Sequence, residues 1–382
     1  MLNNIENNFH IVIIMNIKVL LAQLLPVCLY NYILHKRHSK TFINGFKDYL
    51  NNSGPESWVF KEENLTYQSI VSVQGLGYSG SGAVLDLLCE AESCDVVGTS
   101  NELQRDNDHN GLYEFDFLRL SGCIFEIERF LNSTNIFQND SLINRFIDYL
   151  NGFHLCKVNP SIRELFFKFL ANIIELQIFD IKGVPYNPHL AGNKQTSSIF
   201  FLKQMEIADY RDLCRLFLIQ FFNRINTYNK DCLVFDQLLC DFGCDYSRYS
   251  DYIPNVKVIL VYRDPRDIYV FAKTHIEQDG WMAHENADQF IEWYKILTRN
   301  IDKTSKEILV VQFEKLVNNY EVEKKRIFDY IGMECSEGKA KERTIFIPEV
   351  SRKNIGLWKC SNLPESDFEK IASELSDYCY FD

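Results

Sequence analysis

Two segments of the sequence carry residue types that bind phosphate groups. Gly75-Leu-Gly-Tyr-Ser-Gly-Ser-Gly82 lies between an apolar run at 69–74 and a helical pattern at 83–91. A glycine-rich turn between a strand and a helix directs backbone N–H groups and the helix dipole at a phosphate, and serine hydroxyls add donors. In the second segment, Val258-Ile-Leu-Val-Tyr-Arg-Asp-Pro-Arg-Asp267, Arg263 directly follows a strand and can hold a phosphate through two hydrogen bonds. The alternative for Arg263 is a structural ion pair with Asp267.

The glycine loop alone leaves three interpretations open. Gly75, Gly77 and Gly80 formally satisfy the dinucleotide pattern G-x-G-x-x-G, but no acidic residue clearly ends a second strand at the expected distance. A Walker A loop requires Gly-Lys-Ser/Thr, and this loop contains no lysine. A turn without a ligand is the third interpretation.

A third segment, Ser351-Arg-Lys-Asn-Ile-Gly-Leu-Trp-Lys359, makes the comparison specific. Together, in this order, the three segments resemble the nucleotide-binding motifs of the sulfotransferases that use 3′-phosphoadenosine 5′-phosphosulfate (PAPS). The resemblance covers roughly residues 70–359 and implies that Arg263 grips the 3′-phosphate. Aligned on Gly356, Trp358 and Lys359, the late Arg-Lys pair of the family falls on Ser351 and Arg352, and a slip of one residue places it on Arg352 and Lys353.

The resemblance also implies that the glycine loop binds the 5′-phosphosulfate of PAPS. It further implies that the nucleotide product is 3′-phosphoadenosine 5′-phosphate (PAP). The residues expected to contact the nucleotide there are Gly77, Tyr78, Ser79, Gly80, Ser81, Gly82 and Ala83.

The chain departs from the family pattern at two positions. Tyr78 replaces the loop lysine that touches the transferred sulfuryl group, so its hydroxyl is the expected catalytic donor. Phe271 stands where the family has a serine, and Thr274, one helical turn later, is the expected substitute. The candidates for the missing cation are Arg266, Lys273, Arg352 and Lys353. Because of these departures, a second interpretation stays open, in which the protein has this fold and binds the nucleotide but is not catalytic.

Sulfuryl transfer to a hydroxyl or amine requires a base that takes the acceptor proton. Asp236, after the short apolar run at 232–235, is the first candidate, and its alternative is a helix cap or turn residue. Glu102 is the second, and His109 and His275 rank below it. A kinase or other phosphotransferase that uses a nucleoside triphosphate is the alternative enzyme class, and the missing lysine argues against it.

The elements that must position these residues alternate along the chain. Apolar runs at 69–74, 95–98, 232–235, 256–262 and 308–312 predict buried strands, and helical patterns follow several of them. We predict a three-layer α/β fold with a mostly parallel sheet and a P-loop-like nucleotide-binding core. The expected organisation is an N-terminal helix and linker at 1–60 and a main domain at 61–382, with a helical insertion at about 113–229.

The composition limits the kinds of ligand and partner that the protein is expected to bind. The 382 residues carry a net charge of −12, which argues against nucleic acid as a partner. The 12 cysteines, of which Cys240 and Cys244 are closest in sequence, predict reduced thiols in a cytoplasmic protein and no metal site. The apolar stretch at 11–34 predicts a helix that lies on a membrane or a partner, or one that packs on its own domain. The aromatic content is compatible with a glycan acceptor.

Overall fold

The computed structural model describes residues 42–97, 112–131, 159–181, 197–239, 246–275, 282–301, 305–334 and 345–381, with single positions between 142 and 156 and at 303. The chain divides into two compact units. Unit 1 comprises residues 1–59 and 133–204, and unit 2 comprises residues 60–132 and 205–382. The apolar stretch predicted at 11–34 lies outside the described residues. No helix among the described residues has the length and apolarity needed to cross a membrane.

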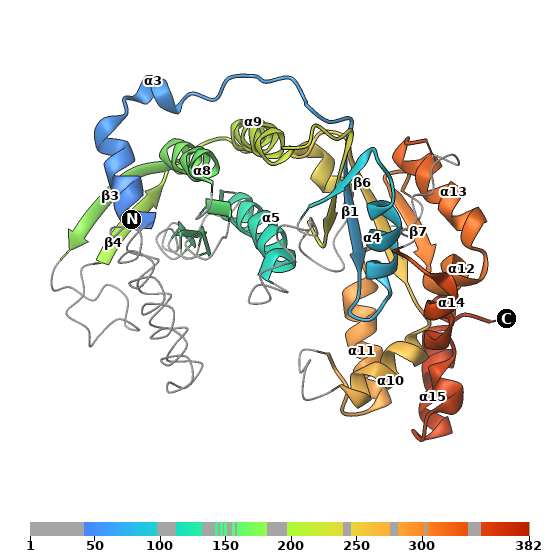
Figure 1. The fold of residues 1–382 in the computed structure, drawn as a ribbon. Coiled ribbons are helices and arrows are strands. Elements are labelled where there is room, and N and C mark those ends of the chain that lie inside the picture. Colours follow the sequence, from blue (N-terminus) through green and yellow to red (C-terminus); the bar gives the residue numbers. More distant parts are fainter. Residues whose placement is uncertain are drawn as a thin grey trace, which may run out of the picture. The chain divides into compact units, whose positions relative to one another are not determined.

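Unit 2 is built on a five-stranded parallel sheet (Figure 1). The strand order is β2 (Cys94–Val96), β5 (Cys232–Asp236), β1 (Ser69–Gly75), β6 (Val256–Tyr262) and β7 (Ile308–Gln312). Every neighbouring pair is parallel, so the carboxyl ends of the strands share one edge. β1 is buried at all seven positions, as the continuous apolar runs predicted.

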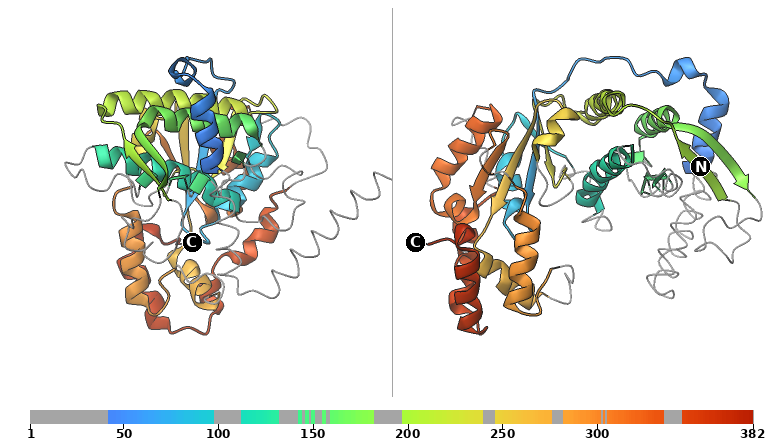
Figure 2. Two further views of the ribbon diagram at one scale, coloured as in Figure 1. Left: turned by 90° about the vertical axis from the view of Figure 1, so that its left-hand side faces the viewer. Right: turned by 180° about the vertical axis from the view of Figure 1, so that it is seen from behind.

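Helices cover both faces of this sheet (Figures 1 and 2). Val71 and Val73 of β1 pack in one apolar cluster with residues of α4 (Ser81–Cys89), α12 (Phe313–Asn318) and α13 (Tyr320–Ile331). On the opposite face, the ring of Phe235 contacts Phe117 of α5 (Leu112–Leu131) and Phe222 of α9 (Ile207–Ile225). The predicted three-layer α/β fold is therefore confirmed.

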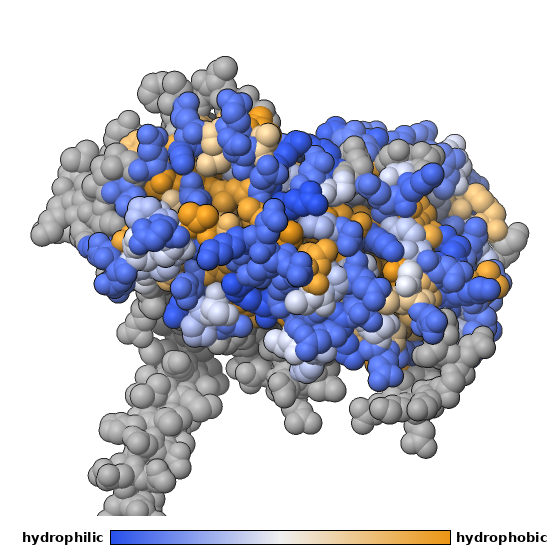
Figure 3. Space-filling model, turned by 90° about the horizontal axis from the view of Figure 1, so that it is seen from above, coloured by the Kyte–Doolittle hydropathy of each residue, from blue (hydrophilic) through white to orange (hydrophobic). Residues whose placement is uncertain are grey.

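A second apolar cluster lies beside the sheet edge and joins three more helices. It includes Ile268 of α10 (Pro265–Thr274), Phe290 of α11 (Ala287–Thr298) and Phe368 of α15 (Glu365–Glu374). The remaining short helices of unit 2 are η3 (Tyr246–Asp251), α14 (Pro348–Ser351), η4 (Arg352–Asn354), η5 (Leu357–Cys360) and η6 (Ser376–Tyr378). Hydrophilic residues predominate on the face shown in Figure 3, with smaller apolar areas between them.

Unit 1 corrects one expectation, because the stretch at about 113–229 is not helical throughout. Besides α8 (Pro160–Ile173), it contains the antiparallel strands β3 (Ile174–Ile181) and β4 (Ser197–Leu202). Ile-Glu-Leu-Gln-Ile alternates apolar with polar residues, which is the period of a strand. The described part of the unit also contains a helix at 42–52 and α3 (Pro55–Trp58), and Phe46 and Phe167 pack within it. Residues 133–204 group with the N-terminal segment rather than with the main domain.

Candidate nucleotide site

The glycine loop connects β1 to α4 at the carboxyl edge of the sheet. Its backbone adopts the left-handed conformation at Tyr78 (φ 62°) and at Gly80 (φ 91°). A β-carbon on Gly75 would lie 2.1 Å from the Oγ of Ser79, and one on Gly80 would lie 2.4 Å from the ring of Phe313. The loop therefore needs glycine at both positions, and it keeps the strain of a non-glycine left-handed residue at Tyr78.

The loop offers hydrogen-bond donors to an anion. Ser79 is only 1% exposed, and its Oγ makes no hydrogen bond within the described structure. α4 begins after Gly80 without a side-chain cap, and the first N–H groups of a helix lack partners within the helix. The N–H of Ala83 is already bonded to the carbonyl of Gly80 at 3.0 Å. The loop thus suits a phosphate or sulfate through Ser79, Ser81 and Gly82 more than through Ala83.

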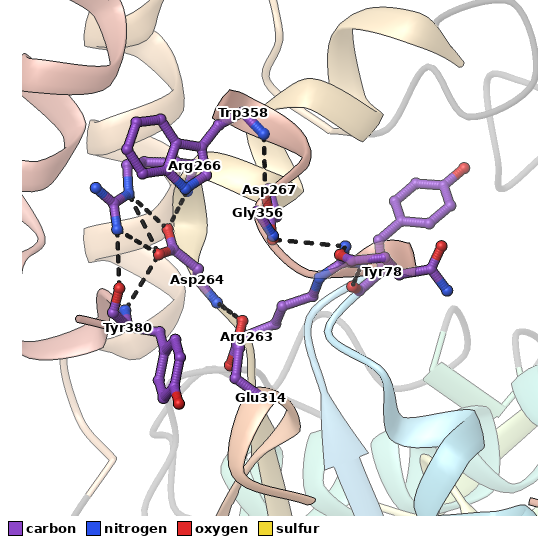
Figure 4. A network of polar contacts seen from close by, with 10 residues as sticks. Tyr78, Arg263, Asp264, Arg266, Asp267, Glu314, Gly356, Trp358 and Tyr380 are labelled. Carbon is purple, nitrogen blue, oxygen red and sulfur yellow. Dashed lines mark hydrogen bonds and ion pairs between the residues drawn. The ribbon is translucent and has the colours of Figure 1, made fainter. Parts of the chain in front are cut away.

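Arg263 follows β6 and is 3% exposed. Its Nη1 donates to the carbonyl of Tyr78 at 3.1 Å, and its Nη2 donates to the carbonyl of Asn354 (Figure 4). The guanidinium lies between two rings, at 4.8 Å from the centroid of Phe271 and 5.2 Å from that of Phe313. The side chain of Arg263 therefore connects the glycine loop and the end of β6 to the C-terminal segment, by which we mean residues 345–381.

The electrostatic surroundings of Arg263 are mixed. Burial lowers the pKa of Arg263, whereas the nearby carboxylates of Asp267 and Glu314 oppose that effect. The ion pair with Asp267 considered from the sequence is present, with 3.8 Å between Nη2 and Oδ2. A guanidinium has five N–H donors, and Nε of Arg263 is buried without a hydrogen bond in the described structure. Donors of Arg263 thus remain for an anion.

Asp264 and Arg266 bind each other and the C-terminal tail. Asp264 caps α10 and accepts from the backbone N–H of Arg266 at 2.9 Å. Its Oδ2 also accepts from Nη2 of Arg266 at 2.6 Å and from the backbone N–H of Tyr380 at 3.1 Å. The guanidinium of Arg266 lies 4.0 Å from the ring centroid of Trp358. Arg266, considered as a replacement cation, is therefore committed to structural contacts.

Asp267 holds the C-terminal segment at the same place. Its carboxylate accepts the backbone N–H groups of Gly356 at 2.8 Å and Trp358 at 3.1 Å (Figure 4). The side chain is fully buried, and burial raises its pKa against the lowering effect of these hydrogen bonds. The carboxylates of Asp264 and Asp267 therefore bind the main chain at Gly356, Trp358 and Tyr380.

Sequence reasoning missed Glu314, in the first turn of α12. It is fully buried and accepts the backbone N–H of Asp264 at 2.8 Å. Burial raises its pKa to about 7. A small pocket is lined by Asp264, Asp267, Glu314, Ile355, Gly356, Trp358, Lys359 and Tyr380. The only sequence signal was an acidic residue shortly after a buried strand.

The two residues that depart from the family pattern contact each other. The rings of Tyr78 and Phe271 are stacked, with centroids 5.0 Å apart and planes within 7°. The ring of Tyr78 points away from the Arg263–Asp267 contacts in Figure 4. Thr274, expected to replace the missing serine, donates its hydroxyl to the carbonyl of Val270 at 2.9 Å. Lys273 donates to the carbonyl of Glu285 at 2.9 Å, so neither side chain supplies a contact to the loop here.

Asp236 ends β5, next to β1, and pairs in register with Val73. Paired residues of parallel strands face the same side of a sheet, and alternation then places Asp236 on the side of Gly75. The next residue, Gln237, is left-handed (φ 52°) and donates its Nε2 to the carbonyl of Gly75 at 3.0 Å. Asp236 is thus close to the glycine loop in the sheet. Glu102 and His109 lie outside the described residues.

Ser351 ends α14, and Arg352 and Lys353 follow in η4 with exposed side chains. The next residue, Asn354, provides the carbonyl that Arg263 binds. The late basic segment therefore lies next to Arg263. No group of His, Cys, Asp and Glu among the described residues has the arrangement of a metal site.

No protein-family model matches the chain, and no curated protein matches it. Sulfotransferases of known structure match over most of it. The sulfotransferase domain of the olefin synthase of Synechococcus PCC 7002 is 14% identical, covers 85% of this chain and 98% of its own, and has a TM-score of 0.34. Sulfotransferase STF1 of Mycobacterium tuberculosis is 10% identical, covers 89% of this chain and 81% of its own, and has a TM-score of 0.36.

Retinol dehydratase, solved in complex with androsterone and PAP, is 14% identical, with coverages of 82% and 81% and a TM-score of 0.31. The first two of these proteins are sulfotransferases, the class of enzyme whose motifs the three sequence segments resemble. Identities and TM-scores this low assign no role to any residue, so the function is inferred below from the residues of this chain.

Proposed function

We propose that the protein transfers a sulfuryl group from PAPS to a hydroxyl or amine acceptor. The observation that carries this proposal is the position of Arg263, which joins the glycine loop through Tyr78 and the late basic segment through Asn354. Three segments that are far apart in the sequence, and that each offer donors to an anion, thereby form one site at the carboxyl edge of a parallel sheet. Open α/β sheets bind ligands at this edge.

The residues present fit the two anionic ends of PAPS. The 5′-phosphosulfate would lie on the glycine loop, where the Oγ of Ser79 has no hydrogen bond to any described residue and α4 begins without a side-chain cap. The 3′-phosphate would be held by the remaining donors of Arg263 and by Arg352 and Lys353. Bound PAPS supplies an activated sulfuryl group, and the chain supplies the donors that neutralise charge on the leaving phosphate.

The acceptor class and the cellular setting stay predictions. The proposed acceptor is a glycan, with which the aromatic content is compatible. The protein is proposed to be cytoplasmic, and its N-terminal segment to contact a membrane or a partner protein. Asp236 is close to the glycine loop in the sheet and remains a candidate base.

One observation favours a second function, a protein that binds the nucleotide without transferring sulfate. The stacked rings of Tyr78 and Phe271 occupy the two positions where the family pattern has a lysine and a serine. Tyr78 adds no positive charge beside the transferred group. In this case PAP would bind, and PAPS would not turn over with any acceptor.

The first test is calorimetric titration with PAP, with ATP and magnesium, and with NAD. Arg263→Ala would also remove structural contacts, so the informative variant is the exposed pair Arg352→Ala/Lys353→Ala. Lys306→Ala is the matched control. This exposed lysine precedes β7 and therefore lies at the amino-terminal ends of the strands, away from the proposed site at their carboxyl ends. We expect tight PAP binding, a loss of about 2 kcal/mol in the double variant as charge-assisted contacts disappear, and no change in the control.

Turnover of labelled PAPS then separates the two functions. Sulfate transfer to any acceptor supports the enzyme, and PAP binding without turnover selects the binding protein. Binding of ATP with magnesium but not of PAP would contradict both and favour a phosphotransferase.

A further inference from the structure

His275 lies at the C-terminal end of α10, beside the glycine loop. Its imidazole is 5.8 Å from the ring of Tyr78 and 5.4 Å from the ring of Phe271, measured between centroids. Tyr78 belongs to the loop itself and Phe271 stacks on it, so the three rings form one group at the edge of the loop. The side chain of His275 is half-buried.

The surroundings of Nδ1 favour one tautomer of this imidazole. Nδ1 lies 2.9 Å from the Oγ1 of Thr274 and 3.3 Å from the carbonyl oxygen of Phe271. A carbonyl can only accept a hydrogen bond, and the hydroxyl of Thr274 has its own acceptor in the carbonyl of Val270 at 2.9 Å. All of these contacts are satisfied together when Nδ1 carries the proton. The neutral ring then has its lone pair on Nε2.

This arrangement is the one that a general base requires. A base needs a free lone pair on one side and an orienting partner on the other. Here Thr274 and the end of α10 hold one nitrogen, and no hydrogen bond within the described structure engages Nε2. A ring beside Tyr78 lies next to the loop that the proposed function assigns to the phosphosulfate.

We propose that His275 is the catalytic base of sulfuryl transfer and that Thr274 is its positioning residue, an inference that rests on the proposed function. The acceptor oxygen or nitrogen forms a bond to sulfur, and its proton passes to Nε2 of His275. The bond between sulfur and the bridging oxygen breaks, and its electron pair leaves with the 5′-phosphate of PAP. Thr274 acts through the imidazole rather than through a phosphate contact.

The first experiment needs no acceptor. The protein is labelled with ¹⁵N-histidine, and the His275 signals are assigned with the His275→Gln variant. We expect the spectrum of the free protein to show the tautomer with hydrogen on Nδ1, and PAP to shift the His275 ring signals. Hydrogen on Nε2, or PAP binding that leaves these signals unmoved, would overturn the proposal for His275. Absence of PAP binding would instead overturn the proposed function, while the tautomer would still be read.

The second experiment compares binding with turnover of labelled PAPS. His275→Gln should lower kcat by about 100-fold or more, the usual contribution of a general base, while PAP affinity changes less than about threefold. His284→Gln is the matched control, because His284 bonds the carbonyl of Met282 through its own Nδ1 at 2.7 Å. Thr274→Val should lower kcat and Thr274→Ser should restore it. Full turnover in His275→Gln would contradict the proposal.

Discussion

Glu314 makes the stability of the protein depend on pH in an unusual direction. Its carboxyl group is fully buried beside Asp264, and burial raises its pKa from 4.5 to about 7. Between these two pH values the folded protein holds a proton that the unfolded chain has already released. The free energy of unfolding therefore falls as the pH rises from about 4.5 to 7, and the loss is complete above pH 7.

The size of the effect follows from the same pKa values. A rise from 4.5 to about 7 corresponds to roughly 3 kcal/mol, since each tenfold change in the proton affinity is about 1.4 kcal/mol. Glu314→Gln removes the titration but keeps the hydrogen bond, because the amide oxygen can still accept the backbone N–H of Asp264. The variant should be about as stable as the wild type near pH 5 and more stable by up to about 3 kcal/mol at pH 8.

Urea unfolding of both proteins at several values between pH 5 and pH 8 measures this difference. Subtracting the two curves removes the titration of other groups, which both proteins share. A difference that stays constant over this range would refute the assignment of the raised pKa to Glu314. A variant that is less stable at pH 8 would show that the ionised carboxylate is stabilised by Arg263 more than burial penalises it.

Two further predictions concern the loop and the C-terminal segment. Gly80→Ala should destabilise the protein by at least about 1–2 kcal/mol, because of its positive φ and the ring of Phe313. Gly82→Ala, whose added β-carbon meets nothing within 4 Å, should be neutral or slightly stabilising in the same thermal unfolding assay; equal losses would contradict the geometry. Asp267→Asn should speed hydrogen exchange at the amides of Gly356 and Trp358 and cost about 1–3 kcal/mol. Unchanged exchange at both amides would show that Asp267 does not hold this segment.

The sequence was a good guide to the elements of unit 2. The strands at 256–262 and 308–312 have the predicted bounds. A continuous apolar run or a helical stripe is a local property, and burial of the sheet on both faces makes it regular. The same reasoning was wrong at 174–202. There the strand-like alternation of apolar and polar residues was overlooked within a long stretch that was predicted to be helical.

What only the tertiary structure decided was the partner of each side chain in the site. The residue type at Arg263 pointed to an anion site, but the stacking of Tyr78 on Phe271 and the contact of Arg263 with Phe271 depend on β1 and β6 being neighbours in the sheet. The carboxyl group of Glu314 became relevant only because α12 follows β7, which also pairs with β6. Residue type and spacing specify what a side chain can do chemically, because these are local properties. Burial, and hence pKa and the choice among partners, depends on contacts between segments far apart in the sequence, such as that of Arg263 with Tyr78, 185 residues away.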